Sequence, residues 1–256
     1  MNESRQVARR RVISLDISLI GYRESVNQVL SMAEKRQPSY ACFANAHMVV
    51  EAFQVPSFQE KVNRATFVFA DGMPLVFALR LLYGVRQQRV AGMDITADIL
   101  KSCEERELSI FLYGSTPRTL EAFADRIRLA YPTLRLAGMI SPPFRPLLQE
   151  EIVRITTEIN QSGAHFVLVG LGCPKQEKWM ADHSHLINAC LLGVGGAFGV
   201  YAGEVRRAPK WMQRLGLEWL FRLGLEPRRL FGRYLATNSL FLVLFFKQVV
   251  LSRFRK

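Results

Sequence analysis

One carboxylate in this sequence stands where a general base could act. Asp71 follows the apolar run TFVFA (66–70) and precedes Gly72, which would place it at the carboxyl end of a buried strand. A carboxylate in that position can accept a hydroxyl proton in a transfer reaction. An Asp-Gly pair is also common in Asx turns and at helix N-caps, so Asp71 taken alone fits both roles.

Three later turns could bring the backbone close to a ligand. The segment GSTP (114–117) joins an apolar run to a helix pattern and could point amides at an anion, although it matches neither GxGxxG nor the P-loop. In GLGCPKQEKW (170–179), Gln176 can donate and accept hydrogen bonds, while Glu177 can simply complement a helix dipole. The glycines of GVGG (193–196) allow close approach of a ligand or equally tight helix packing.

Metal ligands are scarce in the sequence. His183 and His185 form an HxH pair ten residues after Cys173, but no fourth ligand is evident, and the end of a surface helix explains them better. The chain contains no Asp-x-Asp pair, which many nucleotide-sugar transferases use to hold a divalent metal on a diphosphate. In such an enzyme, arginines would have to neutralise the leaving group instead.

The arginines are concentrated at the C-terminal end. Residues 203–256 carry twelve Lys and Arg against three Glu, a net +9 of the chain's +12, interleaved with Trp211, Trp219 and several Leu and Phe. Guanidinium groups bind phosphate bidentately, and large apolar side chains enter the acyl boundary of a membrane. An amphipathic helix packed on its own domain, with solvated arginines outside, has the same composition.

The longest apolar run in this segment, LFLVLFF (240–246), is too short to span a membrane. A spanning helix needs about 20 predominantly apolar residues. We therefore expect contact with the membrane interface at most, favoured on the anionic cytoplasmic side by Arg233 and the basic residues after Leu251.

Apolar runs alternate with helix-period stretches along most of the chain. Continuous apolar runs are typical of parallel strands buried on both faces, and they occur at 41–45, 66–70, 109–114, 134–140, 165–170 and 189–195. Helix patterns separate them at 25–35, 74–82, 94–105, 119–130 and 147–159. The sequence predicts an α/β fold, a Rossmann-like parallel sheet flanked by helices, with its ligand site at the carboxyl ends of the strands.

Composition narrows the class further. A hydrophobic content of 49% over 256 residues can fill a substantial core, which excludes disorder. Four widely spaced cysteines without a CxxC pair indicate free thiols in the cytosol. Outside the first eleven residues and the tail the charges nearly cancel, so no second basic stripe is present and nucleic acid is disfavoured as a partner. The strand-helix rhythm ends after Gly203, which predicts an α/β domain over 1–203 and a basic amphipathic appendage over 204–256.

Six ordered motifs resemble those of the WecG/TagA/CpsF bacterial glycosyltransferases, over about Val12 to Leu235. They are FANAHMVVEA (43–52), FADGMPLV (69–76), RVAGMD (89–94), VGLGCPKQEKWM (169–180), GVGGAFGVYAGEVRRAPKWM (193–212) and GLEWLFRLGLEPRRL (216–230).

The resemblance implies a Rossmann-like enzyme of cell-surface or exopolysaccharide synthesis, peripheral on the cytoplasmic face of the membrane. Such enzymes move a hexose, N-acetylhexosamine or hexuronic acid from a UDP-sugar to a polyprenyl-diphosphate-linked saccharide. They invert the anomeric centre and use neither a metal nor a cofactor besides the donor. In the family the tail also mediates membrane contact and self-association, so a homo-oligomer is a further expectation.

The resemblance also implies roles for individual residues. Asp71 is the expected base toward the acceptor hydroxyl. Arg89 and Gln176 are expected beside it in the catalytic set, and uridine is expected against the PKQE and GVGG turns. The residues expected to bind substrate are Asn45, Gly195, Gly196, Arg207, Arg222, Arg228 and Arg229.

Two other classes of protein fit part of the pattern. A nucleotide-binding, oxidoreductase-like α/β protein would share the sheet, but no strand is followed by GxGxxG with an acidic residue about 20 positions on. A membrane-surface adaptor would use the basic tail alone. Stabilisation against heat by UDP, by NADH or by neither separates the three.

Overall fold

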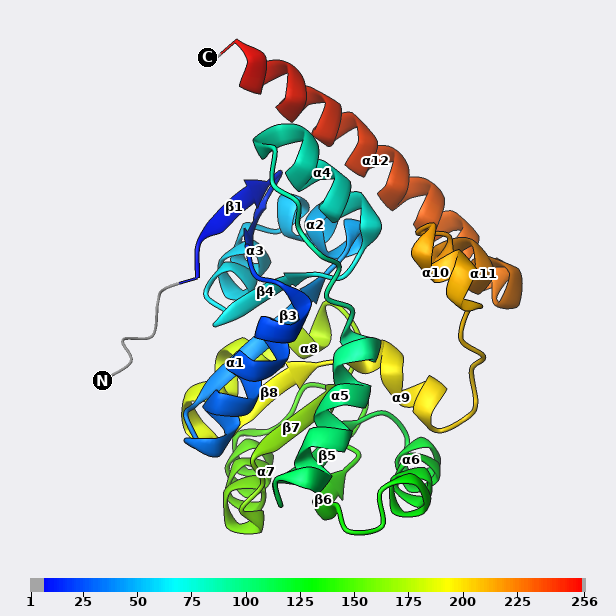
Figure 1. Ribbon diagram of the computed structural model, residues 1–256. Helices are drawn as coiled ribbons and strands as arrows, with labels where there is room; N and C mark the ends of the chain where they lie inside the picture. The colour runs from blue at the N-terminus through cyan, green and yellow to red at the C-terminus, as the bar shows by residue number, and fades with distance from the viewer. Residues whose placement is uncertain (1–6, 255–256) are drawn as a thin grey trace.

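A parallel sheet forms the centre of the molecule. The computed structural model describes residues 7–254, apart from the side chains of Arg214, Arg229 and Arg233. Within these residues a six-stranded, all-parallel sheet has the order β4-β3-β8-β7-β5-β6 (Figure 1). Its strands are β3 (Ser39–Ala44), β4 (Phe67–Ala70), β5 (Ser109–Gly114), β6 (Arg135–Ile140), β7 (Phe166–Gly170) and β8 (Cys190–Gly193). All six predicted runs are confirmed as strands, and so is the α/β class.

Helices cover both faces of this sheet. One core contains side chains of α1 (Tyr22–Glu34), α5 (Gly92–Glu105), α6 (Pro117–Ala130) and α9 (Gly195–Tyr201). The other contains side chains of α2 (Ala46–Gln54), α3 (Pro56–Asn63), α4 (Met73–Tyr83), α7 (Gln149–Ser162) and α8 (Lys175–His183), which leads into a short 3₁₀ turn, η1 (Ser184–Leu186). A sheet covered on both faces accounts for the uninterrupted apolar runs.

The strands divide their side chains between the two cores. In β5, Ile110 and Leu112 face the core of α1, α5, α6 and α9, whereas Phe111 and Tyr113 face the other. Each is at most 1% exposed, and burying a side chain of this size contributes about 1.5–3 kcal/mol. Neither face can therefore take a polar residue cheaply, which fixes the register of the sheet.

Several short elements, β1, β2, α2, α3 and α9 among them, were not predicted. An antiparallel hairpin joins β1 (Arg9–Val12) to β2 (Leu15–Ser18), and its charged outer residues hide the strand pattern. Helix α2 follows β3 directly, with the Asn45 side chain accepting a hydrogen bond from the Met48 amide at 3.1 Å, and α3 begins at Pro56. An asparagine N-cap and a proline at the first helical position are helix-start signals.

The C-terminal segment consists of α10 (Lys210–Arg214), α11 (Glu218–Leu225) and the long helix α12 (Pro227–Arg253). The prediction that nothing here could span a membrane was wrong on length and composition. Leu230–Arg253 is one continuous helix with a mean hydropathy of 1.6 over its most apolar window, of which only 11% is buried. Counting uninterrupted apolar residues missed it, because a helix tolerates single polar residues within an apolar average.

Helix α12 lies on the α/β domain along one stripe. Leu230, Thr237 and Phe241 are buried, and α12 packs against α2, α4 and α11 (Figure 1). Farther along the same stripe, Gln248 accepts a hydrogen bond from the Ile13 amide at 2.8 Å and donates one to the Arg11 carbonyl at 3.0 Å. The helix is therefore fastened at its far end to the turn of the β1–β2 hairpin.

The close approach of β7 to α9 can be tested by substitution. A Cβ on Gly170 would lie 2.8 Å from ring atoms of the buried Phe198, so Gly170→Ala should destabilise the fold by about 1–3 kcal/mol, measured by thermal or urea unfolding. Gly232→Ala is the matched control, since nothing lies within 4 Å of its added Cβ and alanine is the better helix former. Equal midpoints for the two variants would contradict this packing.

Candidate active site

The carboxyl edge of β3, β4 and β8 gathers residues that are far apart in the sequence. Ala44 pairs with Ala70 at the ends of β3 and β4, and the Asp71 amide donates to the Ala44 carbonyl at 2.9 Å. A Cβ on Gly72 would lie 3.3 Å from the Asn45 Cβ, so the Asp-Gly turn rests on the residue that caps α2. The predicted site residues Asn45 and Asp71 are thus in one place.

A backbone hydrogen bond also places Arg89 at this edge of the sheet, near Asp71. The Val90 amide donates to the Ala70 carbonyl at 2.9 Å, which sets the preceding side chain beside Asp71. Burial raises the pKa of Asp71 from 3.8 to about 7, although the nearby Arg89 guanidinium lowers it, while Glu218 and Asp94 raise it further. A carboxyl that titrates near neutrality is suited to accept a proton.

A chain of ion pairs connects Arg89, which lies near this carboxylate, to the C-terminal segment. Arg89 binds Asp94 through Nη2 and Glu218 through Nη1, each at 3.1 Å. Asp94 also binds Arg207, from the connection between α9 and α10. These ion pairs hold two acids, Asp94 and Glu218, near Asp71, and their negative charges oppose its ionisation.

Gln176 joins two of the predicted turns. Its Oε1 accepts from the amides of Gly172 and Gly195, both at 3.1 Å, and its Nε2 donates to the Gly193 carbonyl at 2.9 Å and to Glu177 at 2.7 Å. A Cβ on Gly195 would lie 2.6 Å from this Oε1, so tight packing explains that glycine. The structure gives Gln176 a tethering role, and a direct part in catalysis stays a prediction.

Glu177 lies entirely inside the protein beside Gln176. Burial raises its pKa to about 7, and among the described residues its Oε2 has no hydrogen-bond partner. The simple helix-dipole role considered for an exposed first-turn glutamate does not describe this position. Of the predicted free cysteines, three are buried, and Cys173 is half-buried near Glu177.

The tail contributes arginines to this region unequally. A Cβ on Gly196 would lie 3.8 Å from Nη1 of Arg222, so this guanidinium lies over the glycine turn. The Nε of Arg207 is buried with no hydrogen-bond partner among the described residues. Arg228 is exposed on the first turn of α12, and the side chain of Arg229 lies outside the described part of the chain, so their predicted roles are not addressed by contacts.

A turn of the tail also closes over the Asp71 loop. Gly216 has a left-handed backbone with φ 73°, and a Cβ on it would lie 2.9 Å from the Met73 Cβ. Only glycine allows both the conformation and the contact. The tail therefore meets the α/β domain on both sides of Asp71, at Met73 and at Arg89.

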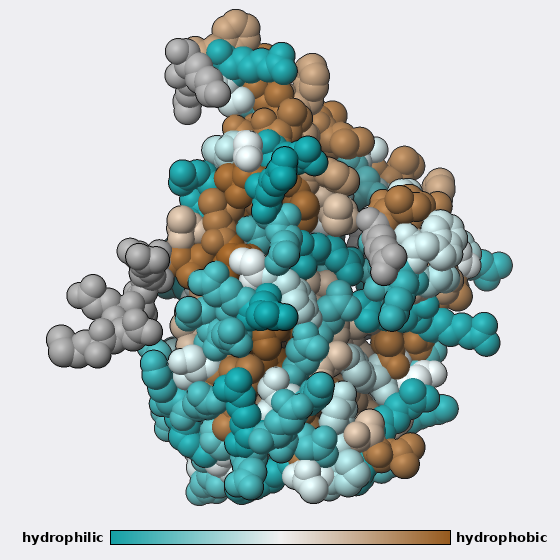
Figure 2. Space-filling view, viewed as in Figure 1, coloured by the Kyte–Doolittle hydropathy of each residue, from teal (hydrophilic) through white to brown (hydrophobic). Residues whose placement is uncertain are grey.

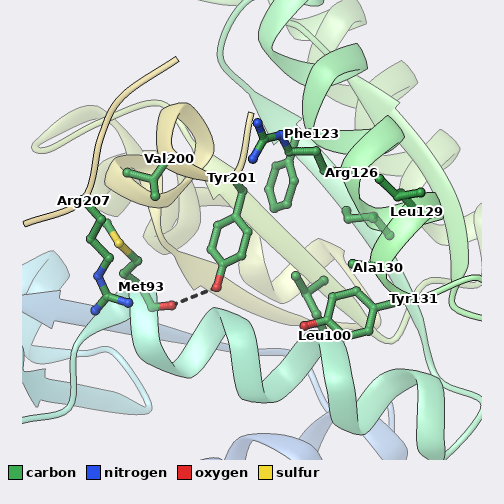
Figure 3. A pocket seen from close by; sticks show the side chains of 11 residues that line it. Met93, Leu100, Phe123, Arg126, Leu129, Ala130, Tyr131, Val200, Tyr201 and Arg207 are labelled. Atoms are coloured by element: carbon green, nitrogen blue, oxygen red, sulfur yellow. Dashed lines mark hydrogen bonds between the residues drawn. The ribbon is translucent and has the colours of Figure 1, made fainter. Parts of the chain in front are cut away.

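A groove of about 530 Å³ opens beside this cluster, between α5, α6 and the end of α9 (Figure 3). Its walls are mostly apolar, including Phe123, Ile127 and Tyr131, and the Tyr201 hydroxyl donates across it to the Met93 carbonyl at 3.2 Å. Among the cluster residues only Arg207 lines it. The residues that line this groove include no carboxylate that could act as a general base.

Two residues of the network were not singled out from the sequence. Asp94 closes the motif RVAGMD and Glu218 stands inside GLEW, so both were within quoted motifs. Their importance comes from pairing with arginines of distant segments, which no local pattern encodes. Among residues 7–254, no group of three or more His, Cys, Asp or Glu is arranged to hold a metal ion.

The chain is similar to known glycosyl transferases. A family model described as "Glycosyl transferase WecG/TagA/CpsF family" matches residues 10–255. The chain is 31% identical over 186 residues to a Bacillus subtilis (strain 168) protein named N-acetylglucosaminyldiphosphoundecaprenol N-acetyl-beta-D-mannosaminyltransferase, covering 72% of this chain and 71% of that protein.

The raised pKa of Asp71 predicts a pH-dependent effect on stability. Since the folded state holds this proton up to about pH 7 and the unfolded state loses it near 3.8, the contribution of Asp71 to stability falls as pH rises through that window. Asp71→Asn should therefore raise the melting temperature relative to wild type more at about pH 8 than at about pH 5.

The exposed Asp125, paired with Arg128 at 2.7 Å, supplies the control. Asp125→Asn should shift the melting temperature slightly and equally at both pH values, because a surface ion pair contributes under about 1 kcal/mol. A pH-independent effect of Asp71→Asn would contradict the burial of its charge.

Proposed function

The chain belongs to the WecG/TagA/CpsF family of glycosyl transferases, and on that premise we propose that it transfers a sugar from a UDP-sugar to a polyprenyl-diphosphate-linked saccharide. The name of the Bacillus subtilis relative describes an acceptor built on undecaprenyl diphosphate, which supports this acceptor class. Family membership makes the chain an enzyme, so the adaptor and the oxidoreductase-like alternatives are set aside. The sugar moved is a hexose, N-acetylhexosamine or hexuronic acid, for a surface or exopolysaccharide.

The observation that carries the mechanism is the half-buried Asp71 beside Arg89 at the sheet edge. Asp71 takes the proton of the acceptor hydroxyl as that oxygen attacks the anomeric carbon of the donor. The new C–O bond forms on the face opposite the leaving UDP, so the anomeric centre inverts. The electron pair of the broken bond goes to the β-phosphate oxygen. A base with a pKa of about 7 is ionised often enough near neutral pH and is still strong enough to hold the proton.

Arginines supply the charge that the leaving diphosphate needs. The Arg222 guanidinium lies over the glycine turn at Gly196, and the Arg207 guanidinium is paired with Asp94 beside Arg89, so both put positive charge near this edge of the sheet. Fixed cations at the position where negative charge develops lower the barrier without a metal. We therefore propose metal-independent transfer with no cofactor besides the donor, and we retain Arg228 and Arg229 as donor-binding residues by family resemblance.

The membrane surface is the proposed location of the reaction. The outward side of α12 exposes Phe231, Leu235, Leu242, Val243 and Phe246, and the hydrophobic surface gathers over the region of α12 and α4 (Figure 2). On α4, Phe77 and Leu81 are more than half exposed. Because α12 is attached to the α/β domain along its other side, these observations support a helix lying on the inner face of the membrane rather than crossing it.

Activity tests the proposal directly. With a short-chain prenyl-diphosphate saccharide as acceptor and a panel of UDP-sugars, UDP release should be retained in the presence of chelator, since no step uses a metal. Asp71→Asn should lower kcat by about 10²–10⁴ because the base is lost, while UDP still protects the folded protein from heat. Full turnover by a folded Asp71→Asn protein would remove the base assignment, and strict metal dependence would remove the arginine mechanism.

Membrane contact can be measured with vesicles containing anionic lipid. Two substitutions on the outward side of α12, Leu242→Asp and Phe246→Asp together, should weaken vesicle binding by at least about 10-fold, because each removes an apolar side chain worth about 1.5–3 kcal/mol when buried. Leu186→Asp, an equally drastic change at an exposed leucine of η1, is the control. Equal binding by both variants in sedimentation assays would place the membrane contact elsewhere.

A further inference from the structure

The two outer nitrogens of Arg89 are both occupied by carboxylates other than Asp71. Nη1 binds Glu218 of α11 and Nη2 binds Asp94 of α5, each at 3.1 Å, and Arg89 is only 16% exposed. Arg89 still lies close enough to Asp71 to lower its pKa. Its hydrogen bonds, however, are made with the two other acids, so the general base keeps its carboxylate free of a direct ion pair.

Removing Glu218 would change this distribution. Nη1 of Arg89 would lose its partner, and Asp71 is the other carboxylate whose charge it faces. An unpaired charge on a half-buried guanidinium is destabilising, so the freed Nη1 would form a hydrogen bond with another acceptor. Arg89 would then bind Asp71 directly, and a carboxylate bound by a guanidinium is a weaker base.

We propose that Glu218 is a positioning residue that holds Arg89 away from Asp71, so that the base is free to accept a proton only when the C-terminal segment is docked. This inference rests on the proposed function, because it assumes that Asp71 removes the acceptor proton. It assigns a role to the acidic residue of the tail, whereas the tail arginines act on the donor. Glu218 touches neither substrate, and it works through Arg89.

The contacts around Glu218 tie its position to the rest of the tail. Two residues earlier, Gly216 packs on Met73 next to the Asp71 loop. One residue later, Trp219 meets Tyr234 of α12 edge to face, with ring centroids 6.1 Å apart. Since α12 is held by its buried stripe and by Gln248, displacement of α12 would withdraw Glu218 from Arg89.

Charged groups from three segments of the chain lie around the Asp71 carboxylate. Asp71 is faced by Arg89 from the segment before α5, by Asp94 from α5 and by Glu218 from α11. Asp94 is faced in turn by Arg207. Loss of the negative charge at Glu218 therefore lowers the pKa of Asp71 in two ways. A repelling acid disappears, and Arg89 becomes available to bind.

The test is the pH dependence of kcat/KM for wild type and Glu218→Gln. The acid limb reports ionisation of the free enzyme's base, and we expect it near pH 7 in the wild type. In Glu218→Gln it should move to lower pH by roughly half a unit or more, with a lower plateau because the base is weaker. Glu121→Gln, which removes a charge from an exposed residue of α6, should leave both limb and plateau unchanged.

Glu218→Asp separates charge from shape. It keeps the negative charge at a shorter reach, so its limb should lie closer to wild type than that of Glu218→Gln. A lower plateau with an unmoved limb in Glu218→Gln would overturn the inference and assign Glu218 to folding alone. A limb that moves as far in Glu218→Asp, or in Glu121→Gln, would overturn it too.

A second measurement does not need activity. The pH above which the stabilisation by Asp71→Asn stops growing reports the pKa of Asp71 in the folded protein, measured by melting temperature. That pH should fall when the parent carries Glu218→Gln, and an unchanged pH would count against the inference. Failure of the proposed function has a different signature. Asp71→Asn would then keep its turnover, whatever Glu218 does to the melting curves.

Discussion

The parallel pairing of β3 with β4 and β8 is the constraint on which the site depends. Because Ala44 stands opposite Ala70 and β8 lies on the other side of β3, the ends of three strands meet at one edge. Asn45, Asp71 and the glycine turn after β8 are therefore neighbours, although they come from opposite ends of the α/β region. The Val90–Ala70 hydrogen bond adds Arg89 to this edge, and Arg89 in turn receives the tail. Each later contact relies on the one before it.

The electrostatics follow from this order of assembly. Asp71 is placed by the sheet, so its burial cannot be relieved by moving away, and its pKa rises. The only described cation in its immediate surroundings, Arg89, is committed to two other acids. Burial and the two neighbouring acids therefore leave Asp71 weakly acidic and without a direct ion pair, although the Gly92 amide donates a hydrogen bond to it. The side-chain amide of Gln176, in contrast, is fully engaged in hydrogen bonds. It makes hydrogen bonds to three backbone groups and holds the turns at Gly172 and Gly193–Gly195 together.

Local sequence patterns were sufficient to predict the sheet, but they were insufficient to predict the ion pairs around Arg89. The six strands could be predicted because both faces are buried and each strand is apolar throughout, and Asp71 could be placed because a strand precedes it. The β1–β2 hairpin escaped because Arg9, Arg10 and Arg11 carry most of its first strand. Glu218 and Asp94 were not singled out, because the ion pairs of Glu218 with Arg89 and of Asp94 with Arg207 join residues 129 and 113 positions apart and leave no periodic trace in the sequence. The apolar length of α12 was underestimated because the prediction counted consecutive apolar residues, whereas the mean hydropathy of the whole helix decides whether it could span a membrane.

The attachment of Gln248 to the hairpin has a consequence for biosynthesis. Strands β3 to β8 are all translated before α11 and α12, so the sheet and its carboxyl edge can assemble while the tail is still being made. Until α11 and α12 dock, with Gln248 at the turn at Ile13, Glu218 is not held against Arg89, and under the proposed role of Glu218 the guanidinium of Arg89 neutralises Asp71. A nascent chain whose tail has not docked therefore carries a folded transferase without an active base.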